Sequence, residues 1–429
     1  MRALVIGSGG REHALCWKLR QSPLLEELYC APGNPGIAEV ADLVPIAVDE
    51  IQKLADFAAD LKIDLTVVGP ELPLTLGIVD DFAQRGLTVF GPSRKAAELE
   101  GSKVFAKEFM RRNGIPTGAF EVVHDAQEAR EAVSRFGYPV VLKADGLAAG
   151  KGVIIATDQA EVDEALTAFF RDRRFGSAAD RVVVEECLVG EELSFIALSD
   201  GERMLTFASS KDYKRIGEDD TGPNTGGMGA HSPAGILSAE LGSAILEEVM
   251  RPTISGMAAE NRPFSGVLYA GLMLCTEGPK VLEYNVRFGD PEVQPLLLRL
   301  EDDLLPVLAS GAKGRFDTQR LRFRQEAAAC VVLASAGYPG DPAKGDPITG
   351  IDTATVRETV EVFHAGTKMA GNRLVSSGGR VLNVCATGKR LADALKRAYD
   401  AAGDIHWSNK TLRRDIGRRV VARTATSGG

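Results

Sequence analysis

The sequence predicts a multidomain protein of the α/β and α+β classes. The chain has 429 residues, more than the roughly 250 to 300 that a single hydrophobic core fills. Its N-terminal quarter alternates short apolar runs with amphipathic segments, which is typical of a parallel sheet covered by helices on both faces. We divide the chain into three parts, residues 1–102, 103–325 and 326–429, with a small subdomain at about 118–190 in the middle part.

Composition narrows the functional classes. Hydrophobic residues make up 45% and charged residues 25% of the chain, which is typical of a soluble globular protein. The net charge of -9 argues against binding to nucleic acid or to a membrane surface, because both favour clustered positive charge. The six cysteines show no Cys-x-x-Cys spacing, so neither a zinc site nor a redox pair is indicated. No apolar run reaches the roughly eighteen residues of a membrane span, and we expect a cytoplasmic protein.

In the N-terminal part, strand and helix signals alternate in a regular order. The predicted strands are RALVIG, ELYCAP, LVPIAV, DLTVVG and LTVFG, and the predicted helices are EHALCWKLRQS, DEIQKLADFAADLK and LTLGIVDDFAQRG. The second helix places Leu54, Ala55 and Ala58 on one apolar face. This order predicts a Rossmann-like arrangement.

The turn VIGSGGREHA joins the first strand to the first helix. Such a turn points backbone N–H groups and the positive helix end at one place, which suits a phosphate. Gly7 and Gly9 fit the dinucleotide fingerprint, but the third glycine position holds Glu12, and the second strand ends without the acidic residue that holds a ribose. Arg11 favours a terminal phosphate monoester instead. The alternative is a tight turn without a ligand.

The small subdomain carries a second glycine-rich segment, VVLKADGLAAGKGVII. Strand alternation puts Lys143 beside Val141 on one face, and a loop with Gly150, Lys151 and Gly152 follows. This loop does not match the Walker A pattern, so we expect a phosphate-binding loop of another class. An ordinary hairpin tip is the alternative.

Acidic side chains follow in VVVEECLVGEELSF. A strand that ends in Glu185 and Glu186 leads to Glu192, an order that could offer backbone groups to an adenine edge and a carboxylate to ribose hydroxyls. Acidic pairs at strand ends are more often solvated surface, so this motif alone is weak evidence.

The motif VLEYNVRFGDPE gives the clearest chemical signal. In a strand, Glu283, Asn285 and Arg287 project to one face and Leu282, Tyr284 and Val286 to the other. Carboxylate and amide oxygens two residues apart suit magnesium or manganese, and an arginine beside them could hold a carboxylate or a phosphoryl group. A hydrogen-bonded polar ladder is the alternative.

The loop DDTGPNTGGMGAHSP carries four glycines around Asn224 and Thr225. Glycine density of this kind lets backbone approach a ligand closely. The charged segment from Lys211 to Arg215, which includes Asp212, precedes it. We expect this loop to bind a second substrate, and a solvated loop is the alternative.

Together these motifs resemble the glycinamide ribonucleotide synthetase family of purine biosynthesis. The stretches that carry the resemblance are GSGGREHALCWKL, APGNPG, VVGPELPL, KADGLAAGKGV, DTGPNTGGMGA and EYNVRFGDPE, and matching segments span almost the whole chain. The resemblance implies an ATP-grasp ligase with a Rossmann-like N-terminal domain, an ATP-grasp core of two subdomains and a C-terminal lobe. It also implies a monomer or homodimer with small-molecule substrates.

The implied reaction joins glycine to 5-phospho-β-D-ribosylamine at the expense of ATP. It passes through glycyl phosphate and gives glycinamide ribonucleotide, ADP and phosphate, with Mg²⁺ or Mn²⁺ as cofactor. Another ATP-grasp ligase or a biotin-type carboxylase is the first alternative, and a dehydrogenase-type or non-catalytic nucleotide-binding protein is the second.

The resemblance also implies roles for single residues. Glu283 and Asn285 would hold the metal, and Lys143, Asp212 and Arg287 would take part in the chemistry. The ATP site would comprise Lys103, Lys143, Gly150, Lys151, Gly152, Glu185, Leu188, Glu192 and Lys214. The other substrates would contact Gly9, Gly10, Arg11, Glu12, Asn34, Glu71, Asn224, Thr225, Gly226 and Asp290. Lys211, Tyr213 and His231 depart from the family pattern, which commonly has Gln, His and Tyr at these positions.

Overall fold

The N-terminal domain is built on a parallel five-stranded sheet with the order β3-β2-β1-β4-β5. The structure is a computed structural model that describes residues 1–147 and 152–426. The strands are β1 (Arg2–Gly7), β2 (Glu27–Pro32), β3 (Asp42–Leu43), β4 (Leu65–Val68) and β5 (Val89–Phe90). The helical segments are α1 (Gly10–Arg20), η1 (Ile37–Glu39), α2 (Ile51–Asp60), α3 (Glu71–Leu76) and α4 (Ile78–Gln84).

Alternation along β1 explains why helices cover both faces of this sheet. Leu4 and Ile6 belong to one buried cluster with the apolar face of α2, whereas Ala3 and Val5 pack with α1 in another. Successive side chains of a strand point to opposite faces, so each face needs its own covering helix. The predicted Rossmann-like arrangement is confirmed.

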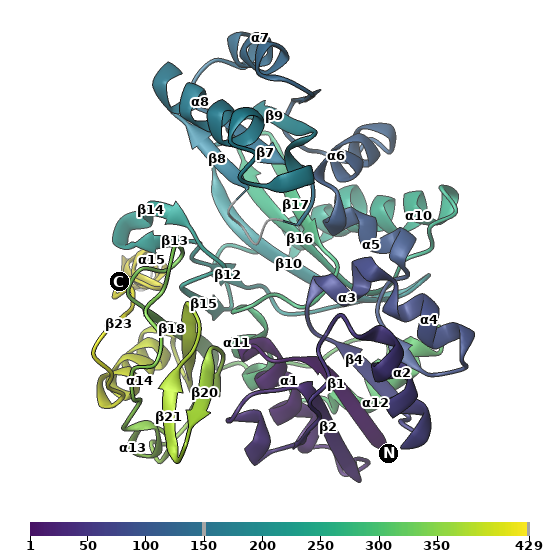
Figure 1. The fold of residues 1–429 in the computed structure, drawn as a ribbon, viewed down its shortest axis with the longest axis vertical. Helices are drawn as coiled ribbons and strands as arrows, with labels where there is room; N and C mark the ends of the chain where they lie inside the picture. Colours follow the sequence, from purple (N-terminus) through teal and green to yellow (C-terminus); the bar gives the residue numbers. More distant parts are fainter. Residues whose placement is uncertain (148–151, 427–429) are drawn as a thin grey trace.

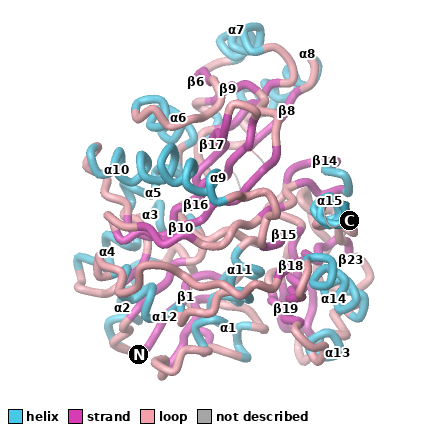
Figure 2. Tube along the Cα trace, turned by 180° about the vertical axis from the view of Figure 1, so that it is seen from behind, coloured by secondary structure: helices cyan, strands magenta, loops and turns pink. Residues whose placement is uncertain are grey.

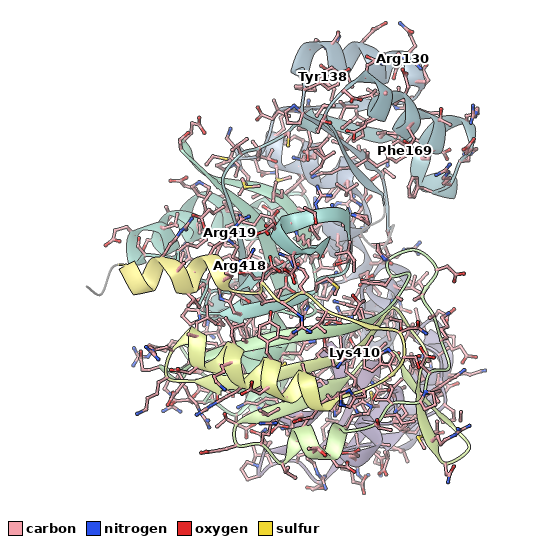
Figure 3. All side chains as sticks on the ribbon, turned by 90° about the vertical axis from the view of Figure 1, so that its left-hand side faces the viewer. Arg130, Tyr138, Phe169, Lys410, Arg418 and Arg419 are labelled. Carbon is pink, nitrogen blue, oxygen red and sulfur yellow. The ribbon has the colours of Figure 1, made fainter. Side chains whose placement is uncertain are left out.

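The small subdomain is an antiparallel sheet with two helices, at the top of Figure 1. Its strand order is β6-β9-β7-β8. The elements are β6 (Phe120–Val123), α7 (Ala126–Phe136), β7 (Val140–Ala144), β8 (Val153–Ala156), α8 (Gln159–Leu166), the π-helical η2 (Thr167–Arg171), η3 (Gly176–Ala179) and β9 (Val182–Glu186). It has a hydrophobic cluster of its own, to which Phe169 belongs, and Figure 3 shows Arg130, Tyr138 and Phe169 at this end of the molecule. We call this unit the clamp subdomain.

A second antiparallel sheet, ordered β11-β10-β16-β17, forms the centre of the molecule. Its strands are β10 (Glu191–Asp200), β11 (Met204–Thr206), β16 (Ser265–Cys275) and β17 (Gly278–Asn285). The helices of this region are α5 (Arg94–Gly101), α6 (Lys103–Arg112), α9 (Ala239–Ile245), the π-helical η5 (Leu246–Met250), α10 (Arg251–Ala259), α11 (Val293–Arg299) and α12 (Leu304–Ala312). Figure 2 shows α9 and α10 beside β10 and β16, and their apolar residues share one cluster with this sheet.

The C-terminal lobe shares its sheet with the middle of the chain. The order β12-β15-β18-β22-β19 places two strands from residues 211–232 beside strands of the last hundred residues. The strands are β12 (Lys211–Asp212), β15 (Gly229–Ser232), β18 (Ala327–Ser335), β19 (Val360–His364), β22 (Arg380–Gly388) and β23 (Lys410–Thr411). Two hairpins lie outside it, β13 (Arg215–Gly217) with β14 (Thr221–Asn224), joined through η4 (Glu218–Asp220), and β20 (Thr367–Ala370) with β21 (Arg373–Ser376). The helices are α13 (Ile351–Thr355), α14 (Leu391–Asp404) and α15 (Arg418–Thr426).

The C-terminal tail is tied to the β13–β14 hairpin by charge pairs. The fully buried Arg413 contacts Asp220 at 3.0 Å and Asp415 at 2.8 Å, and Arg418 pairs with Asp219. Figure 3 shows Arg418 at the start of α15 beside this hairpin. No helix in the described parts of the chain is both long enough and apolar enough to cross a membrane.

Candidate active site

A cavity of about 950 Å³ opens where the N-terminal domain, the clamp subdomain, the central sheet and the C-terminal lobe meet. It collects residues that lie up to several hundred positions apart in the sequence. Its lining includes these residues singled out from the sequence: Arg11, Glu71, Lys103, Lys143, Gly152, Glu185, Leu188, Glu192, Asp212, Lys214, Asn224, Thr225, Gly226, Glu283, Asn285, Arg287 and Asp290. A volume of this size is at the upper end for small-molecule sites.

Four of the predicted residues do not line the cavity. These are Gly9, Gly10, Glu12 and Asn34. Gly150 and Lys151 lie outside the described residues.

At the clamp end of the cavity, one carboxylate is shared by two lysines. Glu185 at the end of β9 pairs with Lys143 of β7 through one oxygen and with Lys107 of α6 through the other. All three residues are buried. Burial opposes ionisation of Glu185, but the two ammonium groups outweigh it and lower its pKa. The pair of lysines and one carboxylate leaves a net positive charge at the wall, which suits a polyphosphate.

Lys103 adds a further cation to this wall. Its Nζ donates to the carbonyl of Gly146 at 2.9 Å, directly before the glycine-rich loop. Burial lowers the pKa of Lys103, and the carboxylate of Glu283 acts against that shift. Leu188, Met273 and Leu282 supply apolar lining in the same cavity.

The motif VLEYNVRFGDPE does not alternate as predicted, because β17 contains a register shift. Gly271 of β16 faces Glu283, whereas its neighbour Leu272 faces Val281. The shift leaves Leu282 partly exposed together with Glu283 and Asn285, whereas Tyr284 and Val286 are buried as predicted, although Tyr284 also borders the cavity. A bulge places two residues against one on the partner strand, which corrects the predicted orientation of Leu282.

Glu283 and Asn285 offer oxygen ligands to the cavity. Lys214 lies 3.1 Å from Glu283 and 3.6 Å from Glu192, and its charge is the main reason that the pKa of Glu283 falls to about 2. No cluster of three or more His, Cys, Asp or Glu suited to a metal occurs among the described residues. One carboxylate and one amide fit a cation such as Mg²⁺, which is usually bound by one or two carboxylates together with substrate phosphates.

Arg287 follows β17 and lies between two carboxylates. Its guanidinium is 3.2 Å from Glu71 of α3 and 2.9 Å from Glu100 of α5. Burial opposes ionisation of Glu71, but Arg287 and Arg11 lower its pKa to about 2. Burial dominates at Glu100 and raises its pKa to about 7. Arg287 is therefore a fixed cation at the junction of the N-terminal domain and the central sheet.

The N-terminal turn is closed by its own carboxylate. Glu12 accepts a hydrogen bond from the backbone N–H of Gly9 at 2.5 Å and from Arg11 Nε at 2.6 Å, so it caps the start of α1. The close approach requires glycine, because a Cβ at Gly7 or Gly69 would fall within 2.6 Å of the Glu12 side chain. The side chain that lines the cavity from this turn is Arg11.

Asn34 is engaged between the N-terminal domain and the C-terminal lobe. Its Nδ2 donates to the carbonyls of Ser8 and His364 at 2.9 Å each, and its Oδ1 accepts from the backbone N–H of Ile37. Gly10 lies against Asn383 of β22, where a Cβ would come within 1.9 Å of the amide nitrogen. In this structure both residues serve the contact between the two domains.

Asp212 reaches the cavity near a second buried carboxylate, Glu292. Burial raises the pKa of Asp212, and the charge of Glu292 adds to the effect. Glu292 accepts hydrogen bonds from Tyr269 at 2.5 Å and from Ser194 at 3.4 Å. Lys214 is one of the cations that act on Asp212.

The departures from the family pattern meet in space. Tyr213 and His231 lie 3.3 Å apart at their hydroxyl and Nε2 atoms, and the Tyr213 hydroxyl accepts a hydrogen bond from the backbone N–H of Gly417 at 2.9 Å. His231 is fully buried, and burial lowers its pKa to about 4. This pair therefore connects the strands β12 and β15 with the C-terminal tail.

Sequence reasoning missed several residues of the cavity wall. These are Lys107, Glu100, Tyr269, Glu292, Tyr338 and Arg380. Lys107 carried a signal, since it sits at helical spacing between the apolar Val104 and Met110 on the buried face of α6. Tyr338 and Arg380 carried none, because they come from the C-terminal lobe.

Comparison with known proteins agrees with this geometry. The chain matches the family models described as Phosphoribosylglycinamide synthetase, N domain, over residues 1–100, ATP-grasp (A) domain over residues 101–293, and C domain over residues 328–419. It is 51% identical to the phosphoribosylamine–glycine ligase of Agrobacterium fabrum over 99% of both chains. Its identity to the enzyme of that name from Vibrio cholerae is 49%, again over 99% of both.

Solved structures give the same result. The crystal structure of phosphoribosylamine–glycine ligase from Thermotoga maritima matches with a TM-score of 0.83 and 34% identity, covering 97% of this chain and all of that one. The biotin carboxylase domain of Hydrogenobacter thermophilus 2-oxoglutarate carboxylase shares the fold, with a TM-score of 0.72, 16% identity, and coverage of 96% of this chain and 91% of that one. Since three family models span most of the sequence and relatives align over nearly all of it, the chain belongs to the phosphoribosylglycinamide synthetase family.

Proposed function

We propose that this protein is an ATP-dependent ligase that joins glycine to 5-phospho-β-D-ribosylamine in purine biosynthesis. The observation that carries the proposal is that one cavity brings Lys143, Glu185 and Glu283 together with Arg11 and Arg287. The first set suits a nucleotide with its metal, and the second suits a sugar phosphate and a reacting carboxylate. The names of the relatives support the same reaction.

The chemistry requires activation of a poor acyl donor. A carboxylate oxygen of glycine attacks the γ-phosphorus of ATP, the bond to the β-phosphate oxygen breaks, and glycyl phosphate and ADP form. The amine nitrogen of phosphoribosylamine then attacks the acyl carbon, phosphate leaves, and the nitrogen loses a proton. Both steps gather negative oxygens, so fixed cations lower the barrier by position and charge.

On the nucleotide side, we assign the phosphates of ATP to the wall formed by Lys103, Lys143 and Glu185. Leu188 would contact the adenine, and Glu192 and Lys214 would lie toward the ribose and the phosphates. The net positive charge of the two lysines around Glu185 supports this assignment. Gly152 borders the same cavity, and the family resemblance extends the assignment to Gly150 and Lys151.

Glu283 and Asn285 would hold a divalent cation, which we propose to be Mg²⁺ or Mn²⁺. When bound, such an ion offsets the negative charge of transferring phosphoryl oxygens. The ionised state of Glu283 supports the assignment. Lys214, at 3.1 Å from Glu283, keeps that carboxylate oriented toward the cavity.

On the acceptor side, Arg11 belongs to α1 of the N-terminal domain, and Arg287 is paired with Glu71 of the same domain. We assign the 5'-phosphate of phosphoribosylamine to the neighbourhood of Arg11 and Glu71, which line the cavity. The family resemblance extends the assignment to Gly9, Gly10, Glu12 and Asn34, which do not line it in this structure. Asn224, Thr225, Gly226 and Asp290 would contact the same two small substrates, and Asp212 would act near the glycine amine. We further propose that the enzyme works in the cytoplasm as a monomer or homodimer.

The decisive experiment measures ADP release with freshly generated phosphoribosylamine. ATP, glycine, amine and metal are omitted in turn, and bicarbonate replaces glycine in one arm. Dependence on ATP, glycine, the amine and the metal supports the ligase. Dependence on bicarbonate would instead favour a carboxylase of the kind that shares this fold. Binding of NAD without ADP release would favour a dehydrogenase-type protein.

A further inference from the structure

Two side chains of the C-terminal lobe reach into the cavity. Arg380 stands at the start of β22, and Tyr338 follows β18. Gly379, which precedes Arg380 in the chain, leaves room for Tyr338, because a Cβ at that position would lie 2.1 Å from the ring of Tyr338. The lobe presents the guanidinium of Arg380 and the hydroxyl of Tyr338 to the same residue, since a Cβ at Gly226 would lie 3.1 Å from the former and 3.3 Å from the latter.

Arg380 connects two segments that are far apart in the sequence. One guanidinium nitrogen, Nη1, donates to the carbonyls of Gly226 and, at 2.6 Å, of Asp290, and the other is 3.1 Å from the Asp290 carboxylate. The hydroxyl of Tyr338 accepts a hydrogen bond from the backbone N–H of Gly226 at 2.8 Å. Both polar groups of the Gly226 backbone are thus engaged by the C-terminal lobe.

The charge of Asp290 links this contact to the N-terminal turn. Burial opposes its ionisation, but Arg380 and, more weakly, Arg11 lower its pKa. The Asp290 carboxylate also lies 3.5 Å from the place that a Cβ of Gly9 would occupy, and it accepts from Gln294 at 2.8 Å. The carboxylate of Asp290, held on one side by Arg380, thus lies beside the N-terminal turn, to which we assign the sugar phosphate.

We propose that Arg380, assisted by Tyr338, is a positioning residue for phosphoribosylamine, because it holds Asp290 and the Gly226 loop in place at the acceptor side of the cavity. The inference rests on the proposed ligase function and adds to it a role for the C-terminal lobe. A guanidinium is needed because its planar group can donate to several acceptors at fixed angles. A lysine ammonium does this less well.

The test compares steady-state constants for each substrate in Arg380→Ala, Arg380→Lys and Tyr338→Phe. Loss of a hydrogen bond to a charged group is expected to raise the KM for phosphoribosylamine about ten-fold or more in Arg380→Ala. Arg380→Lys should fall between that variant and the wild type, and Tyr338→Phe should show about a three-fold rise. The KM for ATP should stay within about two-fold in all three, because among the described residues the two side chains bond to Gly226 and Asp290 and not to Lys103, Lys143 or Glu185.

Arg390→Ala is the matched control. Arg390 lies in the same lobe and pairs with an aspartate, Asp393, but on the exposed start of α14. Its KM values should equal those of the wild type. Should Arg380→Ala not fold, the Tyr338→Phe and Arg380→Lys variants carry the test alone.

Three outcomes are distinct. A KM for phosphoribosylamine unchanged within about two-fold in Arg380→Ala and Tyr338→Phe would overturn the inference, and so would an equal rise for ATP, which would indicate a general structural defect. Failure of the wild-type protein to release ADP in response to glycine and phosphoribosylamine would instead contradict the proposed function.

Discussion

The backbone N–H of His364 donates a hydrogen bond to Nδ1 of His13 over 2.8 Å. His13 belongs to α1 and His364 ends β19, so this bond joins the N-terminal domain to the C-terminal lobe. The acceptor atom must be unprotonated. Burial, with a smaller contribution from His364, lowers the pKa of His13 to about 3, and burial lowers that of His364 to about 4.

We therefore expect the contribution of these two histidines to stability to fall in mild acid. Both pKa values lie below the unfolded value of 6.5. At these two histidines the unfolded state therefore binds more protons once the pH drops beneath about 6.5, and their contribution to stability is present in full only above that pH. The buried carboxyl of Glu100, whose pKa is raised to about 7, acts in the opposite direction. The loss between pH 7.5 and 5 should be about 2 kcal/mol for each histidine. Urea unfolding at several pH values measures it. His364→Phe should reduce the loss by about 2 kcal/mol relative to the wild type, since His13 and the buried His231 still contribute. A replacement of the exposed His124 should give the wild-type pH dependence.

Substitution of Glu283 should disable the metal site. Glu283→Ala removes the carboxylate of the proposed metal pair and the anion that faces Lys214 at 3.1 Å. We expect kcat at moderate Mg²⁺ to fall on the order of 100-fold and the Mg²⁺ concentration at half-maximal rate to rise. Glu277→Ala, in the turn between β16 and β17, is the control. Unchanged activity and an unchanged Mg²⁺ requirement would show that Glu283 is not a ligand.

Local patterns in the sequence predicted the fold well where each element has one buried face. The alternation along β1 and the apolar face of α2 were sufficient for the N-terminal sheet, since each depends on residues close in the chain. The loss of strict alternation at Leu282 could not be predicted, because a bulge depends on how β17 pairs with β16.

The candidate site divides in the same way. Motifs such as VLEYNVRFGDPE carry several functional side chains at short spacing, so each motif could be recognised from the sequence by itself. Arg380 meets Gly226 across 154 positions, and no local pattern marks such a partner. The hydrogen bond from Gly9 to Glu12 was also missed, because the sequence assigned Glu12 to substrate contact and not to the turn itself.

Lys107 should contribute to ATP binding through its positive charge in the nucleotide wall. Lys107→Met keeps much of the buried side-chain volume but leaves Glu185 with Lys143 as its remaining lysine partner. The wall then loses one positive charge, and Lys143 is drawn more fully to Glu185. We expect the KM for ATP to rise on the order of ten-fold, with a small change for phosphoribosylamine. Competition by ADP checks the result, and an unchanged ADP affinity would argue against a nucleotide at this wall.

Arg11 should act on the acceptor and not on the nucleotide. Its Nη1 donates to the carbonyl of Phe288 at 3.1 Å, and its Nε pairs with Glu12, so the charge is held at the N-terminal turn. Arg11→Ala should raise the KM for phosphoribosylamine about ten-fold or more, while that for ATP changes little. A raised KM for ATP with an unchanged KM for phosphoribosylamine would contradict this role. It would favour a nucleotide or a dinucleotide cofactor at the turn.

Arg287 should matter for the chemical step. The guanidinium is fixed by Glu71 and Glu100, so it can face developing negative charge without the cost of reorganisation at the moment of reaction. We expect Arg287→Ala to lower kcat on the order of 100-fold or more. Removal of this cation also leaves the carboxyl groups of Glu71 and Glu100 without their shared partner. Repulsion between them is expected to lower the stability of the site and, through it, kcat. The double variant Arg287→Ala with Glu100→Gln separates the two effects: recovery of stability without recovery of kcat would assign the guanidinium to the reaction, whereas a defect confined to the KM for ATP would contradict that role.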